Sequence, residues 1–194
     1  MDRRPEPGVM AAITATTPIT PVLTDVIDAV REIVQRGLAP EPTAHLAGQA
    51  LRRFLERPGL LTPEQRTGDP ERYRQHVLHA EPDGSFSVVA LVWLPGQRTP
   101  IHDHVSWCVT GVYEGEETER RYLLESDGRR SRLVAIEEVV NPSGAVAAFA
   151  PPGDIHRVWN GGTTKAISIH LYGADIAKLG TSIRRTYAEP AEES

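Results

Sequence analysis

From residue 70 onwards, the sequence breaks into short runs of β-branched and aromatic residues, which Gly, Pro and Asp residues separate. Such runs are typical of strands in a sandwich or barrel, because each is short and ends at a turn signal. The pattern therefore predicts a mostly β structure. The expected strands are residues 73–79, 86–94, 107–113, 119–125, 133–139, 146–150, 156–159 and 166–172.

Two amphipathic helices are predicted ahead of the strands. Apolar residues recur at helical spacing from residue 23 to 34, and Gly37 offers a helix end. A second such pattern follows Pro42, runs over residues 46–55, and stops at the Pro58-Gly59 pair.

The chain of 194 residues is long enough for one domain with a sizeable core. Its first residues are rich in Pro, Thr and Ala and show no periodicity, so we expect an arm without regular structure rather than a secretory signal. The expected organisation is a disordered arm (1–20), one domain (21–188) with a helical part (21–58), a β-barrel (70–174) and a C-terminal helix (175–187), and a tail (189–194).

Charge and cysteine content narrow the partners and the compartment. The chain has 21 Lys and Arg against 26 Asp and Glu, a formal net charge of −5. Without basic clusters it does not offer the concentrated positive field that nucleic acids or anionic membranes require. No apolar run approaches the roughly 20 residues of a membrane span. Because Cys108 is its single cysteine, we expect the protein in the reducing cytoplasm. The expected partner is a small molecule, and the expected assembly is a monomer or a small homo-oligomer.

Three histidines stand where strand geometry would bring them to one metal ion. His102 and His104 are separated by one residue, so on a strand both imidazoles project from the same face. Such a pair alone is a weak signal, since His pairs are common on exposed edges. His156 strengthens it, because the Pro/Gly turn before it delivers a third imidazole to the start of a strand.

The spacing of these histidines resembles the two cupin motifs. The resemblance covers about residues 95–172 and implies a double-stranded β-helix barrel, here behind two N-terminal helices. Cys108 stands where most cupins have a metal-binding Glu. The matching residues are Gly96, His102, His104, Cys108 and Gly115 in the first motif and Pro151, Gly153, His156 and Asn160 in the second.

The missing carboxylate bears on the chemistry. Three neutral imidazoles leave the charge of a divalent metal uncompensated and leave up to three coordination positions open. Such a site favours an anionic, soft donor, and a thiolate meets that requirement. If the metal is redox-active iron, a remaining position can take O₂.

Further residues resemble the cysteine dioxygenase family of thiol dioxygenases, in its bacterial type. They are the His-Asp-His-x-Ser-Trp segment from residue 102, then Gly111, Gly115 and Glu116, and the segment from Ser168 to Tyr172. The resemblance implies that the three histidines hold Fe(II) and that O₂, as co-substrate, turns a thiol into its sulfinic acid.

The resemblance also implies a catalytic triad of Ser168, His170 and Tyr172. Alternation puts these three residues on one strand face, where they can form a chain towards a cavity; the alternative is a solvated polar face. In mammalian-type members a Cys near this position is crosslinked to the Tyr that Tyr172 resembles. The spacing of Cys108 from His104 matches a Gly of the bacterial members instead, so a crosslink and an inert buried thiol both stay open.

The candidate substrate contacts are Tyr73, Gln75, Trp107 and Cys108. Cysteine-specific relatives have an Arg two residues after a Tyr on the first strand, and Gln75 occupies the matching position. A Gln here resembles the subgroup that prefers 3-mercaptopropionate, whose own Arg falls on Thr181 in this sequence. We therefore expect a 3-mercaptopropionate-type thiol to be favoured over cysteine.

Two alternatives stay open. Relatives of similar sequence act on ergothioneine, a bulkier betaine thione that would need neither Arg. A non-catalytic or isomerase-type cupin would instead use its metal for structure or to bind a sugar or an organic acid. The triad and the missing carboxylate ligand favour thiol and dioxygen chemistry over this last class.

Overall fold

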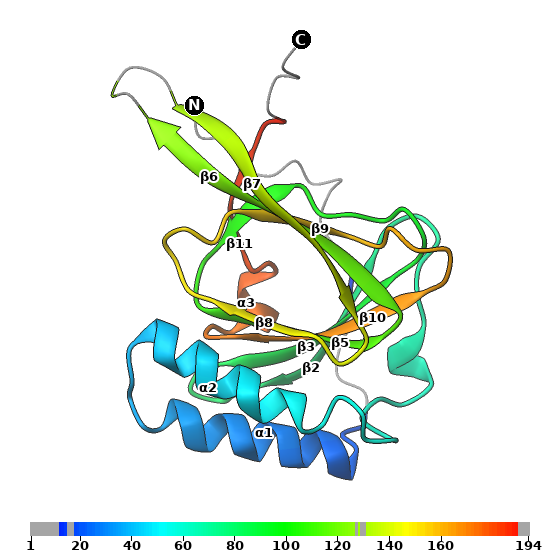
Figure 1. Ribbon diagram of the computed structural model, residues 1–194. Coiled ribbons are helices and arrows are strands. Elements are labelled where there is room, and N and C mark those ends of the chain that lie inside the picture. The colour runs from blue at the N-terminus through cyan, green and yellow to red at the C-terminus, as the bar shows by residue number, and fades with distance from the viewer. Residues whose placement is uncertain (1–11, 15–17, 127, 129–130, 190–194) are drawn as a thin grey trace.

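The computed structural model of the chain describes residues 12–14, 18–126, 128 and 131–189. Two β-sheets face each other, and two helices cover the outer side of one of them (Figure 1). In spatial order the six-stranded sheet contains β1 (Ala12–Thr14), β2 (Arg74–Ala80), β3 (Ser87–Trp93), β10 (Ala166–Tyr172), β5 (Cys108–Glu114) and β8 (Val146–Phe149). The five-stranded sheet contains β11 (Ile183–Tyr187), β4 (Ile101–His104), β9 (His156–Trp159), β6 (Glu116–Ser126) and β7 (Ser131–Pro142).

This architecture confirms the expected mostly β fold, a cupin-type double-stranded β-helix barrel behind two N-terminal helices. All eight strands predicted from the sequence are present, with ends that differ by a few residues. The segment that carries His102 and His104 is the additional strand β4, as the same-face argument for these two histidines required.

The two predicted helices are present as α1 (Pro21–Val34) and α2 (Pro40–Arg52), and α2 begins before Pro42 and ends before the predicted stop at Pro58-Gly59. Thr20 caps α1, since its side-chain oxygen accepts a hydrogen bond from the Leu23 N–H at 3.1 Å. Gly37 follows this helix at φ +63°, a left-handed conformation that glycine adopts without a steric penalty. A short 3₁₀ turn, η1 (Glu64–Arg66), precedes β2.

Strand β10 separates two kinds of environment. Ile167, Ile169 and Leu171 pack outwards into the core beneath the helices. Ser168 and Tyr172 alternate with them and therefore point into the barrel. Because β10 pairs with β3 on one side and β5 on the other, it lies at the centre of its sheet. One strand thus serves the core and the barrel interior.

The expected C-terminal helix over residues 175–187 is wrong. Only α3 (Ile176–Leu179) is helical, and the chain then turns at Gly180, which has φ +76°. The next residues form β11, which pairs antiparallel with β4. Ion pairs from Arg184 and Arg185 to the buried Asp103 of β4, at 2.6 and 3.0 Å, stabilise this pairing. A long-range contact therefore overrides the local helical pattern.

The two predicted terminal segments are described only in part. Ala12–Thr14 pairs in parallel with β2, so this portion of the expected disordered arm is a strand. Residues 1–11 and 15–17 of the arm, and residues 190–194 of the tail, lie outside the described residues. Glu189 forms an ion pair with Arg157 of β9. Among the described residues, no helix is long and apolar enough to cross a bilayer.

Gly173, directly after β10, allows the Trp107 indole to pack closely against the backbone, and this packing can be tested. A Cβ atom at this position would lie 2.1 Å from the Trp107 indole nitrogen, so a side chain requires the buried indole to move. We expect Gly173→Ala to lower the free energy of unfolding by about 1–3 kcal/mol, measured by urea denaturation. Gly162→Ala is the control, because its Cβ would come no closer than 3.2 Å to the flexible end of Glu116 and 3.4 Å to Asn160 Oδ1. Equal losses in both variants would contradict this packing argument.

Candidate metal centre and its cavity

Three buried histidines meet inside the barrel. His102 and His104 come from β4, and His156 begins β9, where it is the register partner of His102. Their candidate ligand nitrogens all lie within 4.8 Å of one another. The structure therefore brings together the three residues that the sequence singled out as metal ligands.

Each of these imidazoles is held at its Nδ1 atom by a different acceptor. His102 Nδ1 lies 3.0 Å from the Pro100 carbonyl oxygen, and His104 Nδ1 lies 3.0 Å from Asp154 Oδ2. His156 Nδ1 lies 2.7 Å from Glu119 Oε1. With Nδ1 occupied, each ring has only Nε2 left for a metal.

The Nε2 atom of His156 is the observation that tests whether a metal fits. This atom is buried and has no hydrogen-bond partner among the described residues, which costs free energy unless a ligand satisfies it. A divalent cation satisfies it, because neutral imidazole is a good ligand for Fe, Zn and similar metals. The donor set therefore fits a metal ion.

The charges around the cluster are arranged for a cation. Burial and the neighbouring histidines lower the pKa of His102 well below its ordinary value, so its ring is neutral at neutral pH. Burial alone would raise the pKa of Asp154 and Glu119. For Asp154, the hydrogen bonds and charge of His104 together outweigh burial and lower the pKa. For Glu119, the hydrogen bonds and charges of His156 and Arg121 together do the same. Two buried carboxylates thus supply negative charge through the imidazoles that would bind the metal. The sequence-based expectation of an uncompensated metal charge did not include them.

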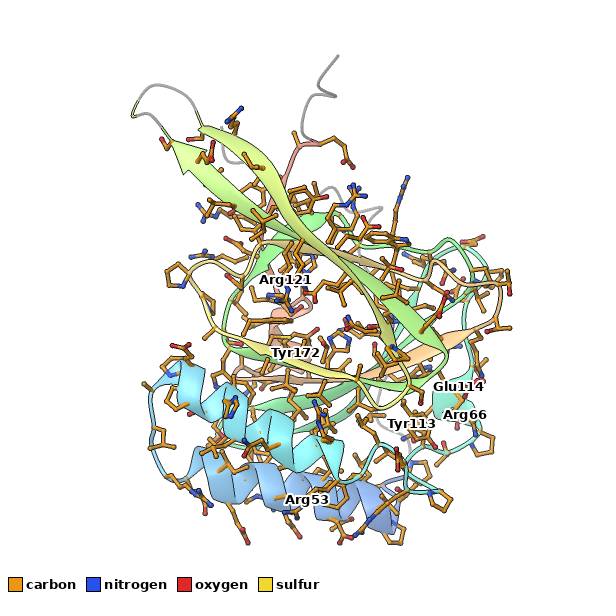
Figure 2. The ribbon with its side chains drawn as sticks, in the orientation of Figure 1. Arg53, Arg66, Tyr113, Glu114, Arg121 and Tyr172 are labelled. Carbon is orange, nitrogen blue, oxygen red and sulfur yellow. The ribbon has the colours of Figure 1, made fainter. Side chains whose placement is uncertain are left out.

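The three residues expected to form a triad are in hydrogen-bond contact. Ser168 Oγ lies 2.8 Å from His170 Nε2, and the Tyr172 hydroxyl lies 3.0 Å from His170 Nδ1. The indole N–H of Trp93 donates to Ser168 Oγ at 3.1 Å. Figure 2 shows Tyr172 in the space between the two sheets. The alternative of a solvated polar face is wrong, because all three side chains are buried.

His170 and Tyr172 share a cavity with the histidine cluster. Burial lowers the pKa of His170 to about 3, so its ring is neutral at neutral pH, and burial raises the pKa of Tyr172 well above its ordinary value. The cavity is lined by Tyr73, Gln75, Leu91, Trp93, Thr99, Pro100, His102, His104, His156, Val158, His170, Tyr172, Gly180, Thr181, Ser182 and Ile183.

Two of the four candidate substrate contacts line this cavity and two do not. Tyr73 and Gln75 lie on its wall, and the Gln75 amide nitrogen is buried without a partner among the described residues. Trp107 packs in the core beneath the helices. Cys108 faces inwards but lies in an apolar cluster next to Tyr172, its register partner on β10. Burial raises the pKa of the Cys108 thiol well above its ordinary value, as expected of an inert thiol.

Strict alternation along β2 would place Gln75, Val77 and His79 on one face, but it fails after Val77. The register with β3 shifts between Val77 and His79, which is a β-bulge. His79 consequently lies against Phe86 and Glu81, on the side of the helices, instead of sharing the cavity face with Gln75. The prediction for Gln75 is unaffected because it precedes the bulge.

A family comparison agrees with this geometry. The family model described as cysteine dioxygenase type I matches residues 65–180, which is more than half of the chain. The chain belongs to the cysteine dioxygenase type I family. A curated relative, cysteine dioxygenase type 1 of Danio rerio, is 28% identical over 120 residues, or 61% of this chain. Those residues span 59% of the relative, less than two thirds of its length.

Solved structures give partial matches. A double-stranded β-helix protein from Klebsiella pneumoniae aligns with a TM-score of 0.48 at 18% identity, covering 69% of this chain and 100% of that chain. A protein from Thermus thermophilus, TT1209, aligns with a TM-score of 0.43 at 20% identity, covering 59% of this chain and 96% of that chain.

Sequence reasoning missed the residues that orient the ligands of this cysteine dioxygenase family member. Asp154 lies two residues before His156 but binds His104, 50 residues away in sequence. Glu119 binds His156 across 37 residues. No signal in the sequence singled out Glu119, because β6 carries several other acidic residues.

The cluster predicts how metal binding responds to substitution. We expect His156→Ala to remove most bound metal, because it deletes a ligand. We expect Glu119→Gln to weaken binding about 10- to 100-fold, because it removes the charge that orients and polarises His156. Competition with a chromophoric chelator measures both affinities, and Glu125→Gln, at an exposed position of β6, is the control. A His156→Ala protein with stoichiometric metal and unchanged affinity would refute the assignment.

Proposed function

We propose that this protein is a mononuclear non-haem Fe(II) thiol dioxygenase that converts a small thiol and O₂ into the sulfinic acid. One observation carries the proposal. The three-histidine cluster, which includes no carboxylate in the described part of the chain, opens on the same cavity as His170 and Tyr172. Family membership supports the same chemistry.

His102, His104 and His156 would hold the iron through their Nε2 atoms. When bound, Fe(II) supplies a Lewis acid for the thiolate and the redox chemistry for O₂. The buried carboxylates Asp154 and Glu119 keep the imidazoles in the tautomer that presents Nε2. A metal-binding cupin of another class would have no evident use for the triad beside this cluster.

Tyr172 is the residue best placed to act on the substrate. Its hydroxyl lies at the cavity end of the hydrogen-bonded chain through His170 to Ser168, and its ring centroid lies 6.1 Å from that of His104. A buried phenol of raised pKa stays protonated and can hydrogen-bond to a thiolate or to an oxygen atom. His170 and Ser168 orient this hydroxyl.

The cavity wall favours a thiol that carries little charge besides its sulfur. Among the lining residues of the described chain there is no Lys, Arg, Asp or Glu. Thr181 does line the cavity, at the position where the 3-mercaptopropionate subgroup has an Arg. Arg184 and Arg185 bind Asp103 instead, and Lys178 binds Asp175. A carboxylate would therefore rely on neutral donors such as the unpaired Gln75 amide.

This wall discriminates between the candidate substrates. 3-Mercaptopropionate presents one charged group that the Gln75 amide can meet, whereas cysteine adds an ammonium group for which the described part of the wall offers no carboxylate. We therefore propose a 3-mercaptopropionate-type substrate over cysteine, with ergothioneine as the alternative for a wider pocket. We place the reaction in the cytoplasm, because the chain's one cysteine is a free thiol.

The role of Tyr172 can be separated from metal binding. We expect Tyr172→Phe to lower the turnover rate about 100-fold, because a positioned proton donor is lost, while iron content stays unchanged. Oxygen uptake and iron analysis of the same preparation measure the two effects. Tyr113→Phe, a change on β5 outside the cavity lining, is the control. Equal turnover by the Tyr172→Phe variant and the wild type would contradict the role.

The substrate proposal is tested by oxygen uptake with the Fe(II)-loaded protein. The panel contains 3-mercaptopropionate, L-cysteine, cysteamine and ergothioneine. A missing charge-assisted contact costs roughly 1.5–3 kcal/mol, so kcat/KM for 3-mercaptopropionate should exceed that for cysteine by about one to two factors of ten. Gln75→Arg should raise kcat/KM for both carboxylate-bearing thiols by adding a cation, and it should not narrow this gap, because the ammonium group of cysteine still has no partner.

Two outcomes would contradict the substrate proposal. The highest kcat/KM with L-cysteine would refute the argument from the cavity wall, and the highest value with ergothioneine would favour that alternative. No uptake with any thiol would favour the non-catalytic or isomerase-type cupin.

A further inference from the structure

Glu117 is a buried acid that has no role in the proposed reaction as described above. It lies on β6 with its side chain inside the barrel, and the residue is 3% exposed. Its Oε1 atom has no hydrogen-bond partner among the described residues. The Ser168 hydroxyl and the Trp93 indole N–H lie beside the carboxyl group and stabilise its ionised form. Glu117 thus adjoins the end of the triad that lies farthest from Tyr172.

The surroundings of Glu117 make both of its protonation states accessible. Burial raises its pKa to about 7, although Ser168 and Trp93 oppose this shift, and the charge of Glu119 on the same strand adds to it. The other ionisable groups in electrostatic reach are Cys108 of β5 and Tyr172 of β10, which both have strongly raised pKa values and stay neutral.

An ionised Glu117 fixes the direction of every hydrogen bond along the triad. An ionised carboxylate accepts the Ser168 hydroxyl proton. Ser168 Oγ, which already accepts from Trp93, then accepts from His170 Nε2–H. The neutral ring consequently has a bare Nδ1, which accepts the Tyr172 hydroxyl proton, so that the phenol oxygen faces the cavity as an acceptor.

A protonated Glu117 reverses every one of these bonds. Its own O–H donates to Ser168 Oγ, and the Ser168 hydroxyl donates to His170 Nε2. His170 then carries its proton on Nδ1 and donates to the Tyr172 oxygen. The Tyr172 hydroxyl is left free to donate into the cavity.

We propose that Glu117 is a positioning residue that sets the direction of the Ser168–His170–Tyr172 hydrogen-bond chain and accepts the proton that the chain carries away from the cavity. The proton balance is complete. A thiol S–H proton passes to the Tyr172 oxygen, the phenol proton to His170 Nδ1, the Nε2 proton to Ser168, and the Ser168 proton to the carboxylate. The thiol becomes a thiolate and Glu117 becomes neutral, with no net charge created in the chain itself.

The direction of the Ser168–His170–Tyr172 hydrogen-bond chain is inferred from the hydrogen bonds themselves. Proton transfer from a thiol along this hydrogen-bond chain rests on the proposed function. Ring ¹⁵N NMR of the Zn(II)-loaded protein therefore tests the chain without turnover. We expect His170, assigned by the loss of its signals in His170→Asn, to change from the Nε2–H to the Nδ1–H tautomer as pH falls through about 7. In Glu117→Gln the tautomer should not change with pH. Glu116→Gln, at an exposed position on the same strand, should behave like the wild type.

Two further measurements test the role of Glu117. If Glu117→Gln does not fold, Ser168→Ala breaks the chain at its next member, and the His170 tautomer should again become independent of pH. In the Fe(II)-loaded enzyme, the pH profile of kcat/KM should lose an ionisation near pH 7 in Glu117→Gln and keep it in Glu116→Gln.

Stability gives an independent readout of the same group. The folded-state pKa of about 7 exceeds the ordinary value of 4.5, so Glu117 contributes stability below about pH 4.5 that is lost as pH rises through 7. The melting temperature of Glu117→Gln should therefore depend less on pH between 5 and 8.

A His170 tautomer that stays fixed between pH 5 and 9 in the wild type would overturn the proposal. A tautomer change that survives in Glu117→Gln would also overturn it. Absence of thiol oxidation by the wild-type enzyme would instead refute the proposed function, while the NMR titration would still decide the role of Glu117.

Discussion

The hydrogen bonds at the Nδ1 atoms of three buried imidazoles are the constraint on which the rest of the site depends. Each bond fixes a ring and its tautomer, and together they aim the Nε2 atoms of His102, His104 and His156 at one point. The acceptors come from the loop before β4, the turn before β9 and the first half of β6. The ligands can therefore meet only when β4, β9 and β6 are correctly paired in the five-stranded sheet.

The opposite sheet contributes the second half of the site through the alternation of one strand. The outward side chains of β10 pack under the helices, and this packing holds the strand at the centre of its sheet. Ser168, His170 and Tyr172 face the metal cluster from that rigid position. A site built on strands in this way is held more firmly than one built on loops. The chemistry therefore depends on a hydrophobic core that lies outside the barrel.

The C-terminal segment completes the cavity wall. Asp103 points away from the two histidines that flank it and accepts hydrogen bonds from Arg184, Arg185 and Tyr187 of β11. This pairing places Thr181 and the residues beside it on the cavity. The basic side chains of the segment are held by Asp103, so the wall they border is neutral. Among the described residues, the absence of a cation from the lining thus follows from where β11 is anchored.

Periodicity in the sequence determined eight of the strands, the two helices, and the shared face of the triad, and the single-residue spacing of His102 and His104 determined that they share a face, because side-chain direction along a strand is a local property. It could not determine β11, since Asp103 binds that segment across more than 80 residues and overrides its local pattern. It also could not reveal that Asp154, Glu119 and Glu117 gather around the site. Those contacts join strands that are distant in sequence, and only the pairing of the sheets decides which buried acids meet which histidines.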